Sequence, residues 1–271
     1  MPDLELARDG LTARCPMWLA VAALIHGVTT RKALPQANSP DFRLALGRAR
    51  VGGAIPVLPT LGAHQVHGTN IGVVTKSGHE SAIDIEFFPN DKQSGRFRET
   101  DALICEVPGT LIVVQTADCL PLFLLDEENH RVGLAHCGWR GLRANLAGLI
   151  ARRMIDRGSG AKALQAWLGP CIRADQYEVG PNLAAQFQST FPNIPPDQLT
   201  PGGTHLDLAF LARRQLEGAG LPPNRIFDSE SCTLSHPDLY HSYRGQGERA
   251  GRMLSFMSLT DWRGSAMPQA P

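Results

Sequence analysis

The sequence has no excess of charge of either sign and no long apolar segment. Its 271 residues contain twenty-six basic and twenty-six acidic side chains, so the formal net charge is zero. Without excess positive charge, a protein has no long-range field that attracts nucleic acid or an anionic membrane surface. The apolar stretch Pro16–Ile25 is too short to cross a bilayer, and no small-residue cleavage site follows it. We therefore predict no nucleic-acid and no membrane partner, and we interpret Pro16–Ile25 as a buried strand.

Closely spaced cysteine pairs are also missing. The six cysteines form no CxxC motif and are spread over the whole chain. This pattern differs from the dense spacing of a small disulfide-rich secreted domain. We expect reduced thiols and a cytoplasmic location.

The composition is otherwise that of a globular protein, with 43% hydrophobic and 19% charged residues. The chain is near the upper limit of length for a single core. We predict one domain over residues 1–271, with flexible ends at residues 1–15 and 263–271.

The central part of the sequence combines short apolar runs with reactive side chains. Three runs, at residues 111–114, 120–125 and 132–135, have the length of buried strands. Polar residues interrupt them at Thr116–Cys119 and His136–Arg140, which places reactive groups at strand ends. A hairpin formed by the second and third runs would bring Cys119 and His136 side by side, because their separation of seventeen positions matches two strands and a turn.

A histidine outside this stretch completes a metal-ligand set. The motif HQVHG (64–68) contains His64 and His67, and we expect only one of them to face the site. With His67, Cys119 and His136, two imidazoles and one thiolate form a donor set that zinc favours. Three protein ligands leave a fourth position for water or substrate, as in catalytic zinc sites. The sequence therefore predicts a zinc site.

The same residues allow two other interpretations. Cys119 could act as a nucleophile activated by His136, as in cysteine hydrolases. Copper also accepts thiolate and imidazole ligands. A multicopper oxidase needs several His-x-His pairs, however, and the nine histidines of this chain form none.

Two arginines follow predicted strands and are candidates for anion binding. Arg31 ends the motif HGVTTR, at a transition from strand to loop. Arg140 lies in the turn before a segment whose apolar residues repeat every three to four positions as far as Gly158, which predicts one helix. A helix N-terminus with an adjacent guanidinium attracts phosphate or carboxylate. Each arginine could instead be a surface charge or part of a salt bridge.

Further elements are predicted elsewhere along the chain. Strands are expected at residues 71–75, 101–107, 164–168 and 253–259, and helices at residues 41–51, 181–191 and 207–217. Residues 76–100 are polar and rich in turn signals, so we expect an exposed excursion with a hairpin around Ile83–Phe88.

Six motifs together resemble one protein family. They are HGVTTR (26–31), HQVHG (64–68), TADCLPL (116–122), AHCGWRGL (135–142), LGPCI followed by YEVG (168–172 and 177–180), and SYRGQGERAGRM (242–253). In this order, over residues 24 to 260, they resemble the YfiH-like or laccase-domain family of polyphenol oxidase-like proteins, more recently described as purine nucleoside phosphorylases. The TADC and HxGWRG motifs at this separation are very specific.

The resemblance implies a mixed α/β (α+β) fold, in a single layered α/β sandwich-type domain with internal duplication. It implies zinc binding and catalysis by His67, Cys119 and His136. The implied reactions are phosphorolysis of adenosine, inosine, guanosine and methylthioadenosine to base and sugar 1-phosphate, and deamination of adenosine. Purine nucleosides and phosphate are thus the expected small-molecule partners. The alternatives are a copper-dependent polyphenol oxidase and a metal-binding protein with a non-catalytic partner-binding role.

Phosphorolysis needs a cationic pocket and a proton donor for the departing base. Arg31, Arg140 and, more distantly, Arg244 are the candidates for phosphate binding, and Glu178 and Asp118 are candidates for proton donation. The sequence departs from the family pattern in the segment after Arg31, in a missing Trp before QVHG, and in a longer segment near residues 87–97. These changes leave the ligand trio intact, but they bear on which nucleoside the protein prefers. The sequence does not predict the oligomeric state.

Overall fold

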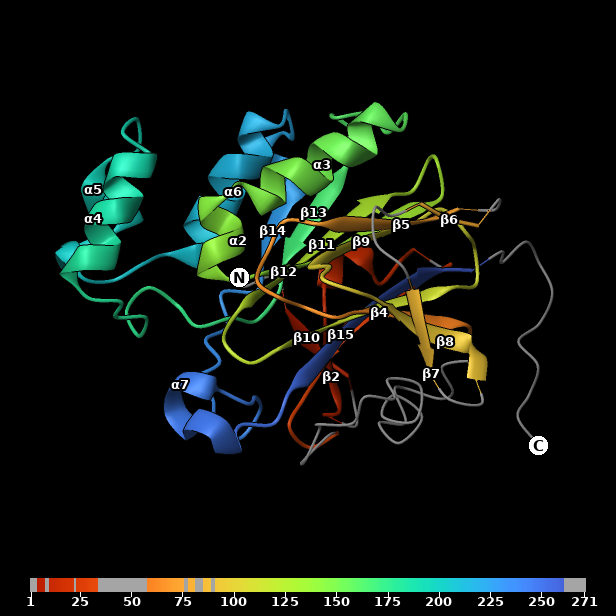
Figure 1. Ribbon diagram of the computed structural model, residues 1–271, viewed down its shortest axis with the longest axis horizontal. Helices are drawn as coiled ribbons and strands as arrows, with labels where there is room; N and C mark the ends of the chain where they lie inside the picture. Colours follow the sequence, from red (N-terminus) through yellow and green to blue (C-terminus); the bar gives the residue numbers. More distant parts are fainter. Residues whose placement is uncertain are drawn as a thin grey trace.

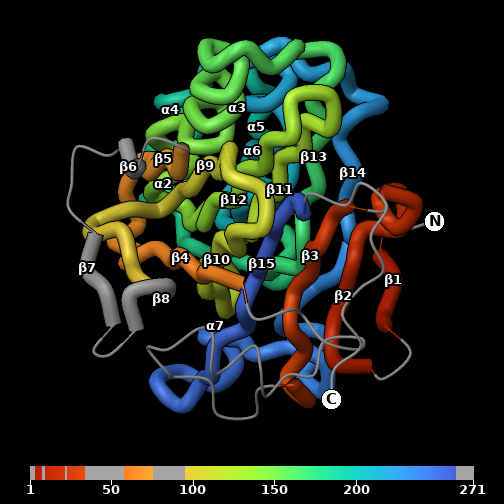
Figure 2. The backbone as a smooth tube through the Cα atoms, turned by 90° about the vertical axis from the view of Figure 1, so that its right-hand side faces the viewer, coloured from red at the N-terminus to blue at the C-terminus, as the bar shows by residue number. Residues whose placement is uncertain are grey.

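The computed structural model describes residues 4–7, 10–21, 23–33, 58–75, 78–80, 85–88 and 91–260. Its described strands form two mixed sheets, and helices cover one of them (Figures 1 and 2). The mixed α+β class and the layered arrangement are therefore confirmed, whereas the internal duplication stays a prediction.

The first sheet, sheet A, has eight described strands and forms one outer layer. Their order is β1 (Glu5–Leu6), β2 (Thr12–Arg14), β3 (Leu24–Thr29), β15 (Met253–Leu259), β10 (Leu111–Thr116), β4 (Thr60–Ala63), β8 (Asp91–Phe97) and β7 (Ile85–Phe88). The pairs β10–β4 and β4–β8 are parallel, whereas β10 is antiparallel to β15. Segments from the first and last parts of the described chain thus lie side by side in this sheet, where β3 pairs with β15.

The second sheet, sheet B, has seven described strands and is the middle layer. Their order is β14 (Ile226–Asp228), β13 (Gln165–Leu168), β11 (Leu120–Asp126), β12 (Arg131–Cys137), β9 (Ala102–Cys105), β5 (Ile71–Thr75) and β6 (Gly78–Glu80). The predicted strands at 111–114, 120–125 and 132–135 are confirmed as β10, β11 and β12. Strands β5, β9, β13 and β15 likewise confirm the predictions at 71–75, 101–107, 164–168 and 253–259.

Helices form the third layer, on the face of sheet B that is turned away from sheet A (Figure 1). They are α2 (Trp139–Arg143), α3 (Leu146–Asp156), α4 (Pro181–Thr190), α5 (Pro196–Leu199) and α6 (Leu208–Gly218). A further helix, α7 (Tyr243–Gln246), lies apart from this layer. Short 3-10 turns span Pro16–Trp18, Pro201–Gly203, Pro223–Arg225 and Gly247–Arg249. The helices predicted at 181–191 and 207–217 correspond to α4 and α6. No described helix has the length and apolar character needed to cross a membrane.

Strand β11 shows why its sequence is continuously apolar. Leu122 and Leu124 belong to the core between sheet B and the helices, whereas Phe123 and Leu125 belong to the core between the two sheets. Successive side chains of a strand point to opposite faces, so a strand buried on both faces cannot alternate between apolar and polar residues.

Three predictions about local structure differ from the structure. The single helix expected before Gly158 is divided into α2 and α3 at Asn145, whose φ of 67° is left-handed and cannot continue a helix. The segment Pro16–Ile25 begins with a 3-10 turn, and the strand starts only at Leu24. Residues 12–14, expected within a flexible end, form β2 and pair with β3.

Two other predictions concern segments near the gaps in the described residues. The predicted hairpin is present in a longer form, because β7 pairs with β8 and β8 continues sheet A. The helix predicted at 41–51 and the flexible end at 263–271 lie outside the described residues.

Candidate active site

The three predicted metal ligands meet at one end of the two sheets. His67 follows β4, Cys119 lies between β10 and β11, and His136 lies near the end of β12. Their ligand atoms all lie within 4.8 Å of one another. The residues between β10 and β11 carry the chain from sheet A to sheet B, so the trio sits where the two sheets come together.

The predicted hairpin between β11 and β12 explains half of this arrangement. Leu120 pairs with Cys137 and Pro121 pairs with His136. Cys119 precedes this antiparallel register directly, which places its thiol at the open end of the hairpin beside His136. The rings of His67 and His136 are 4.7 Å apart, edge to face.

Asp101, which sequence reasoning missed, organises both histidines. Its carboxylate accepts hydrogen bonds from the N–H groups of Val66 at 3.1 Å, His67 at 3.0 Å and Gly68 at 2.7 Å. It also lies 2.8 Å from Nδ1 of His136. The only sequence signal was an acidic residue immediately before an apolar strand.

A second contact fixes the loop that carries His67. The side-chain amide of Gln65 donates to the carbonyl of Gln115 at 2.6 Å, and its oxygen accepts from the Gln115 N–H at 2.7 Å. The amide thereby extends the pairing of β10 and anchors the loop to sheet A. His67 itself has a φ of 60°, an unusual value for a residue with a side chain.

The electrostatics of the site favour a thiolate on Cys119 and a proton on His136, which His136 would release on binding a metal. Burial opposes ionisation of Cys119, but His136 and His67 outweigh it and lower the pKa of the thiol to about 6. Burial likewise disfavours charge on His136, but Cys119 and Asp101 raise its pKa to about 9. Burial raises the pKa of Asp101, and the hydrogen bond from His136 outweighs this and holds it below its ordinary value. The site is therefore built around a thiolate and an ionised carboxylate.

These residues fit a metal ion that accepts thiolate and imidazole ligands. Asp101 occupies Nδ1 of His136 and leaves Nε2 for a metal, the usual carboxylate–histidine arrangement. Gly138 adds a steric requirement, because a Cβ there would lie 2.9 Å from Cδ2 of His67 and 3.1 Å from Sγ of Cys119. The backbone thus approaches the ligands more closely than any other residue type would allow.

The trio opens into a cavity of about 670 Å³. Its wall includes three aromatic residues, Trp139, Tyr177 and Tyr243, and three arginines, Arg96, Arg244 and Arg252. Both His64 and His67 line it, but of these two histidines only His67 belongs to the described ligand group, as expected. The cavity combines flat apolar surfaces with cations, which suits a planar ligand together with an anion.

The predicted arginines lie in three different environments. Arg244 lines the cavity. The guanidinium of Arg140 lies 4.3 Å from the ring centre of Trp139, a cavity residue, although Arg140 is not among the described lining residues. Arg31 donates to the carbonyl of Pro237 at 3.0 Å and, within the described part of the chain, is also outside the lining.

Two arginines of the lining were missed, Arg96 in β8 and Arg252 just before β15. Arg252 stands in the motif SYRGQGERAGRM, which was a signal for it. No sequence signal pointed to Arg96, because only the pairing of β8 with β4 brings this residue to the cavity.

The two acidic candidates for proton donation are placed differently. The Asp118 carboxylate accepts from the hydroxyl of Thr233 and from the N–H of Arg244, both at 2.6 Å. Glu178 is exposed and lies outside the described cavity lining. Asp118 therefore anchors the start of α7 beside Cys119, and neither acid presents a free carboxyl to the cavity.

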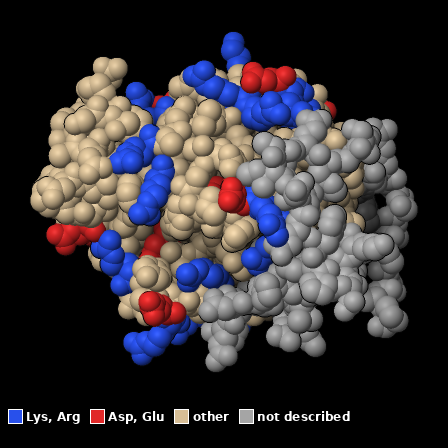
Figure 3. Space-filling model, viewed as in Figure 1, with Lys and Arg blue, Asp and Glu red and all other residues tan. Residues whose placement is uncertain are grey.

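Charge on one face of the molecule is mixed. On the face shown in Figure 3, basic side chains form separate groups among acidic and uncharged residues. This distribution agrees with the zero net charge of the chain.

Comparisons with known proteins agree with the resemblance read from the motifs. Residues 45–260 match the family described as multi-copper polyphenol oxidoreductase laccase. The purine nucleoside phosphorylase YlmD of Geobacillus stearothermophilus is 31% identical over 278 residues, covering 95% of this chain and 97% of YlmD. Its crystal structure superposes with a TM-score of 0.76 at 25% identity, covering 96% of this chain and 100% of the YlmD chain.

Two further relatives match over shorter regions. A purine nucleoside phosphorylase of Deinococcus radiodurans is 38% identical over 168 residues, which cover 62% of this chain and 64% of that relative, less than two thirds of its length. The adenosine deaminase RL5 of an unknown prokaryotic organism is 30% identical over 194 residues, covering 70% of this chain and 71% of RL5.

Proposed function

This chain belongs to the multi-copper polyphenol oxidoreductase laccase family, and we propose that it is a zinc-dependent purine nucleoside phosphorylase with adenosine deaminase activity. Its substrates would be adenosine, inosine, guanosine and methylthioadenosine, cleaved with phosphate to base and sugar 1-phosphate. The names of the relatives support both activities. The six cysteines are free thiols, in keeping with a cytoplasmic location.

One observation carries the proposal: the His67, Cys119 and His136 trio opens into a cavity that also presents arginine and aromatic side chains. Phosphorolysis joins an anion to a flat nucleoside, and this cavity has surfaces for both.

The trio would hold zinc, and Asp101 would fix the orientation of His136. Bound zinc would supply a Lewis acid at the wall of the cavity. Trp139 and Tyr243 offer flat surfaces on which a purine can stack. Arg140 lies against Trp139 and supports that surface.

Arg244, Arg252 and Arg96 are the residues that we assign to phosphate. Guanidinium groups bind phosphate oxygens through two parallel hydrogen bonds. Arg252 already donates to the carbonyls of Ala250 at 2.9 Å and Gly251 at 3.0 Å through one nitrogen, which fixes its position. Arg31 is not part of this assignment because Pro237 binds its guanidinium.

The test is product analysis by mass spectrometry, with metal-quantified protein and adenosine, with and without phosphate. We expect adenine and ribose 1-phosphate only with phosphate, and inosine without it. His67→Ala should abolish both reactions, whereas His64→Ala, a cavity histidine outside the trio, should retain them. Zinc-loaded protein that forms none of these products would contradict the proposal and favour a non-catalytic binding role. Oxidation of phenols that requires added copper would favour the polyphenol oxidase alternative.

A further inference from the structure

Cleavage of a nucleoside leaves an electron pair on the purine, and the departing base needs a hydrogen-bond or proton donor. The identity of this donor rests on the proposed function. Asp118 is excluded because both of its carboxylate oxygens already accept short hydrogen bonds, from Thr233 and Arg244. Glu178 is excluded because, among the described residues, it does not line the cavity.

The remaining donors of the cavity wall differ in exposure. His64 is exposed, and Tyr243 is 51% exposed. At such positions water competes for any hydrogen bond to the base. Tyr177 is half-buried, and within the described part of the structure its hydroxyl has no protein partner. Among the tyrosines that line the cavity and the lining histidine His64, it is therefore the donor best shielded from solvent.

The backbone around Tyr177 is fixed on both sides. Its carbonyl accepts from the N–H of Leu206 at 3.1 Å, and the next residue but one, Val179, donates to the Thr204 carbonyl at 2.8 Å. A donor must be held at a defined position to act in a transition state, because misplacement reduces its contribution. This pairing supplies that constraint for Tyr177.

Arg244 opposes the effects of burial and of Cys119, which together raise the pKa of the Tyr177 phenol to about 12. Its guanidinium lies 5.3 Å from the ring centre of Tyr177. A cation at this distance is attracted to the ring, and the attraction grows as negative charge develops on the phenol oxygen. The backbone N–H of Arg244 donates to Asp118, which fixes the backbone from which this side chain extends.

We propose that Tyr177 is a catalytic residue that donates its phenolic proton to a ring nitrogen of the departing purine. The bond between C1′ and N9 breaks, and its electron pair stays with the purine. A phosphate oxygen forms the new bond to C1′, and the proton lost by hydrogenphosphate restores the phenol of Tyr177. The products are the neutral base and ribose 1-phosphate, so atoms and charges balance.

Tyr177→Phe tests this assignment when it is combined with substrates whose leaving groups need no proton. We expect kcat for adenosine phosphorolysis to fall about 100-fold, in the range of a lost general acid. For 7-methylguanosine and 4-nitrophenyl ribofuranoside, kcat should change less than about 3-fold, because a fixed positive charge or a stable phenolate replaces protonation. Tyr240→Phe, which removes a hydroxyl in the core between the sheets, serves as the matched control and should leave all three rates unchanged.

The outcomes separate this inference from the proposed function. If the unmodified protein cleaves none of the three substrates, the phosphorylase proposal itself fails. If it cleaves them and Tyr177→Phe loses equal activity on all of them, or loses little on adenosine, only the role of Tyr177 is overturned. Zinc content and the thermal midpoint, measured on each variant, show whether the fold and the metal site are intact.

Discussion

An acidic residue flanks strand β9 at each end of its pairing with β12, and these two ends of the strand pair have different roles. Ala102 pairs with Ala135 near one end, and Cys105 pairs with Val132 near the other. Asp101 precedes β9 and contacts His136 at 2.8 Å, and Glu106 follows β9 and contacts Arg131 at 2.7 Å. The same strand pair thus holds an imidazole at one end and a guanidinium at the other.

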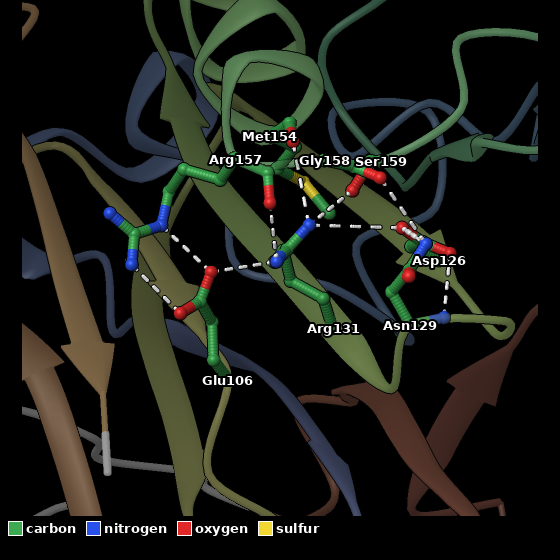
Figure 4. A network of polar contacts seen from close by, with 8 residues as sticks. All are labelled: Glu106, Asp126, Asn129, Arg131, Met154, Arg157, Gly158 and Ser159. Carbon is green, nitrogen blue, oxygen red and sulfur yellow. Dashed lines mark hydrogen bonds and ion pairs between the residues drawn. The ribbon is translucent and has the colours of Figure 1, made fainter. Parts of the chain in front are cut away.

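At the Glu106 end every charged group is paired (Figure 4). Arg131 donates to Glu106 and Ser159, both at 2.7 Å, and to the carbonyl of Arg157 at 2.8 Å. Arg157 in turn donates twice to Glu106, at 2.7 and 2.8 Å. Such a closed network offers nothing to a ligand and joins the end of α3 to sheet B.

At the Asp101 end the carboxylate is equally well bonded, but the groups that it positions face a cavity. Its partners His67 and His136 converge with Cys119 and leave ligand atoms available. The comparison shows that a buried acid marks function only when its partners keep unused bonding capacity. Three substitutions and one pH dependence test this distinction. They follow in order of decreasing expected change in free energy.

Cys119→Ala should have the largest effect because it removes one of three metal ligands. We expect loss of stoichiometric zinc and a loss of turnover of about a thousandfold, equivalent to about 4 kcal/mol. Metal analysis and phosphorolysis rates provide the measurement. Cys105→Ala removes a buried thiol at the opposite end of β9 and should keep its zinc. Equal zinc content in both variants would contradict the assignment of Cys119.

Arg131→Ala should instead affect stability. Its removal leaves Glu106 and Asp126 with a missing partner in a largely buried network, at a cost of about 3 kcal/mol in the free energy of unfolding. Urea denaturation measures this cost, and activity per folded molecule should persist. Arg214→Ala, which breaks an exposed pair with Glu217, should cost less than about 0.5 kcal/mol. A similar cost in both variants would show that the network contributes little.

Asp101→Asn tests the end of the strand pair that serves the site. Loss of the carboxylate weakens the orientation of His136, and zinc affinity should fall about 10- to 100-fold, or about 2 kcal/mol. Competition with a chelator of known affinity measures the change. Asp207→Asn, at the N-cap of α6, is the control because asparagine caps helices as well as aspartate. Unchanged zinc affinity in Asp101→Asn would refute the positioning role.

The smallest expected effect is a pH dependence at the Glu106 end. The hydrogen bond from Arg157, followed by the charge of Arg131, outweighs burial and lowers the pKa of Glu106 below its ordinary value of 4.5. The unfolded chain therefore binds the proton more readily, so the stabilisation is present above pH 4.5 and is lost as the pH falls further. Urea unfolding of wild type and Glu106→Gln should differ by less than about 1 kcal/mol at pH 7, and this difference should shrink below pH 4.5. A difference that grows on acidification would reverse the sign of this argument.

Local patterns were enough to predict the central strands and the ligand trio. The apolar runs that became β10, β11 and β12 are strands because they are short and continuous, and both faces of β11 and β12 are buried. Cys119 and His136 follow from the hairpin register. His67 was found from the chemistry of its side chain together with the motif around it.

Other features depend on which distant segments meet, and no local pattern encodes them. Arg96 reaches the cavity through the pairing of β8 with β4, and Asp118 is committed to Thr233, more than a hundred residues away. In the sequence, Asp101 is only an acidic residue before a strand. Its role depends on the loop that carries His67, whose backbone N–H donates to the Asp101 carboxylate. The sequence by itself determined which side chains could bind a metal, because donor chemistry is a property of the residue. Only the tertiary structure decided which charges are satisfied and which remain open to a ligand, because that depends on partners brought together by the packing of the two sheets.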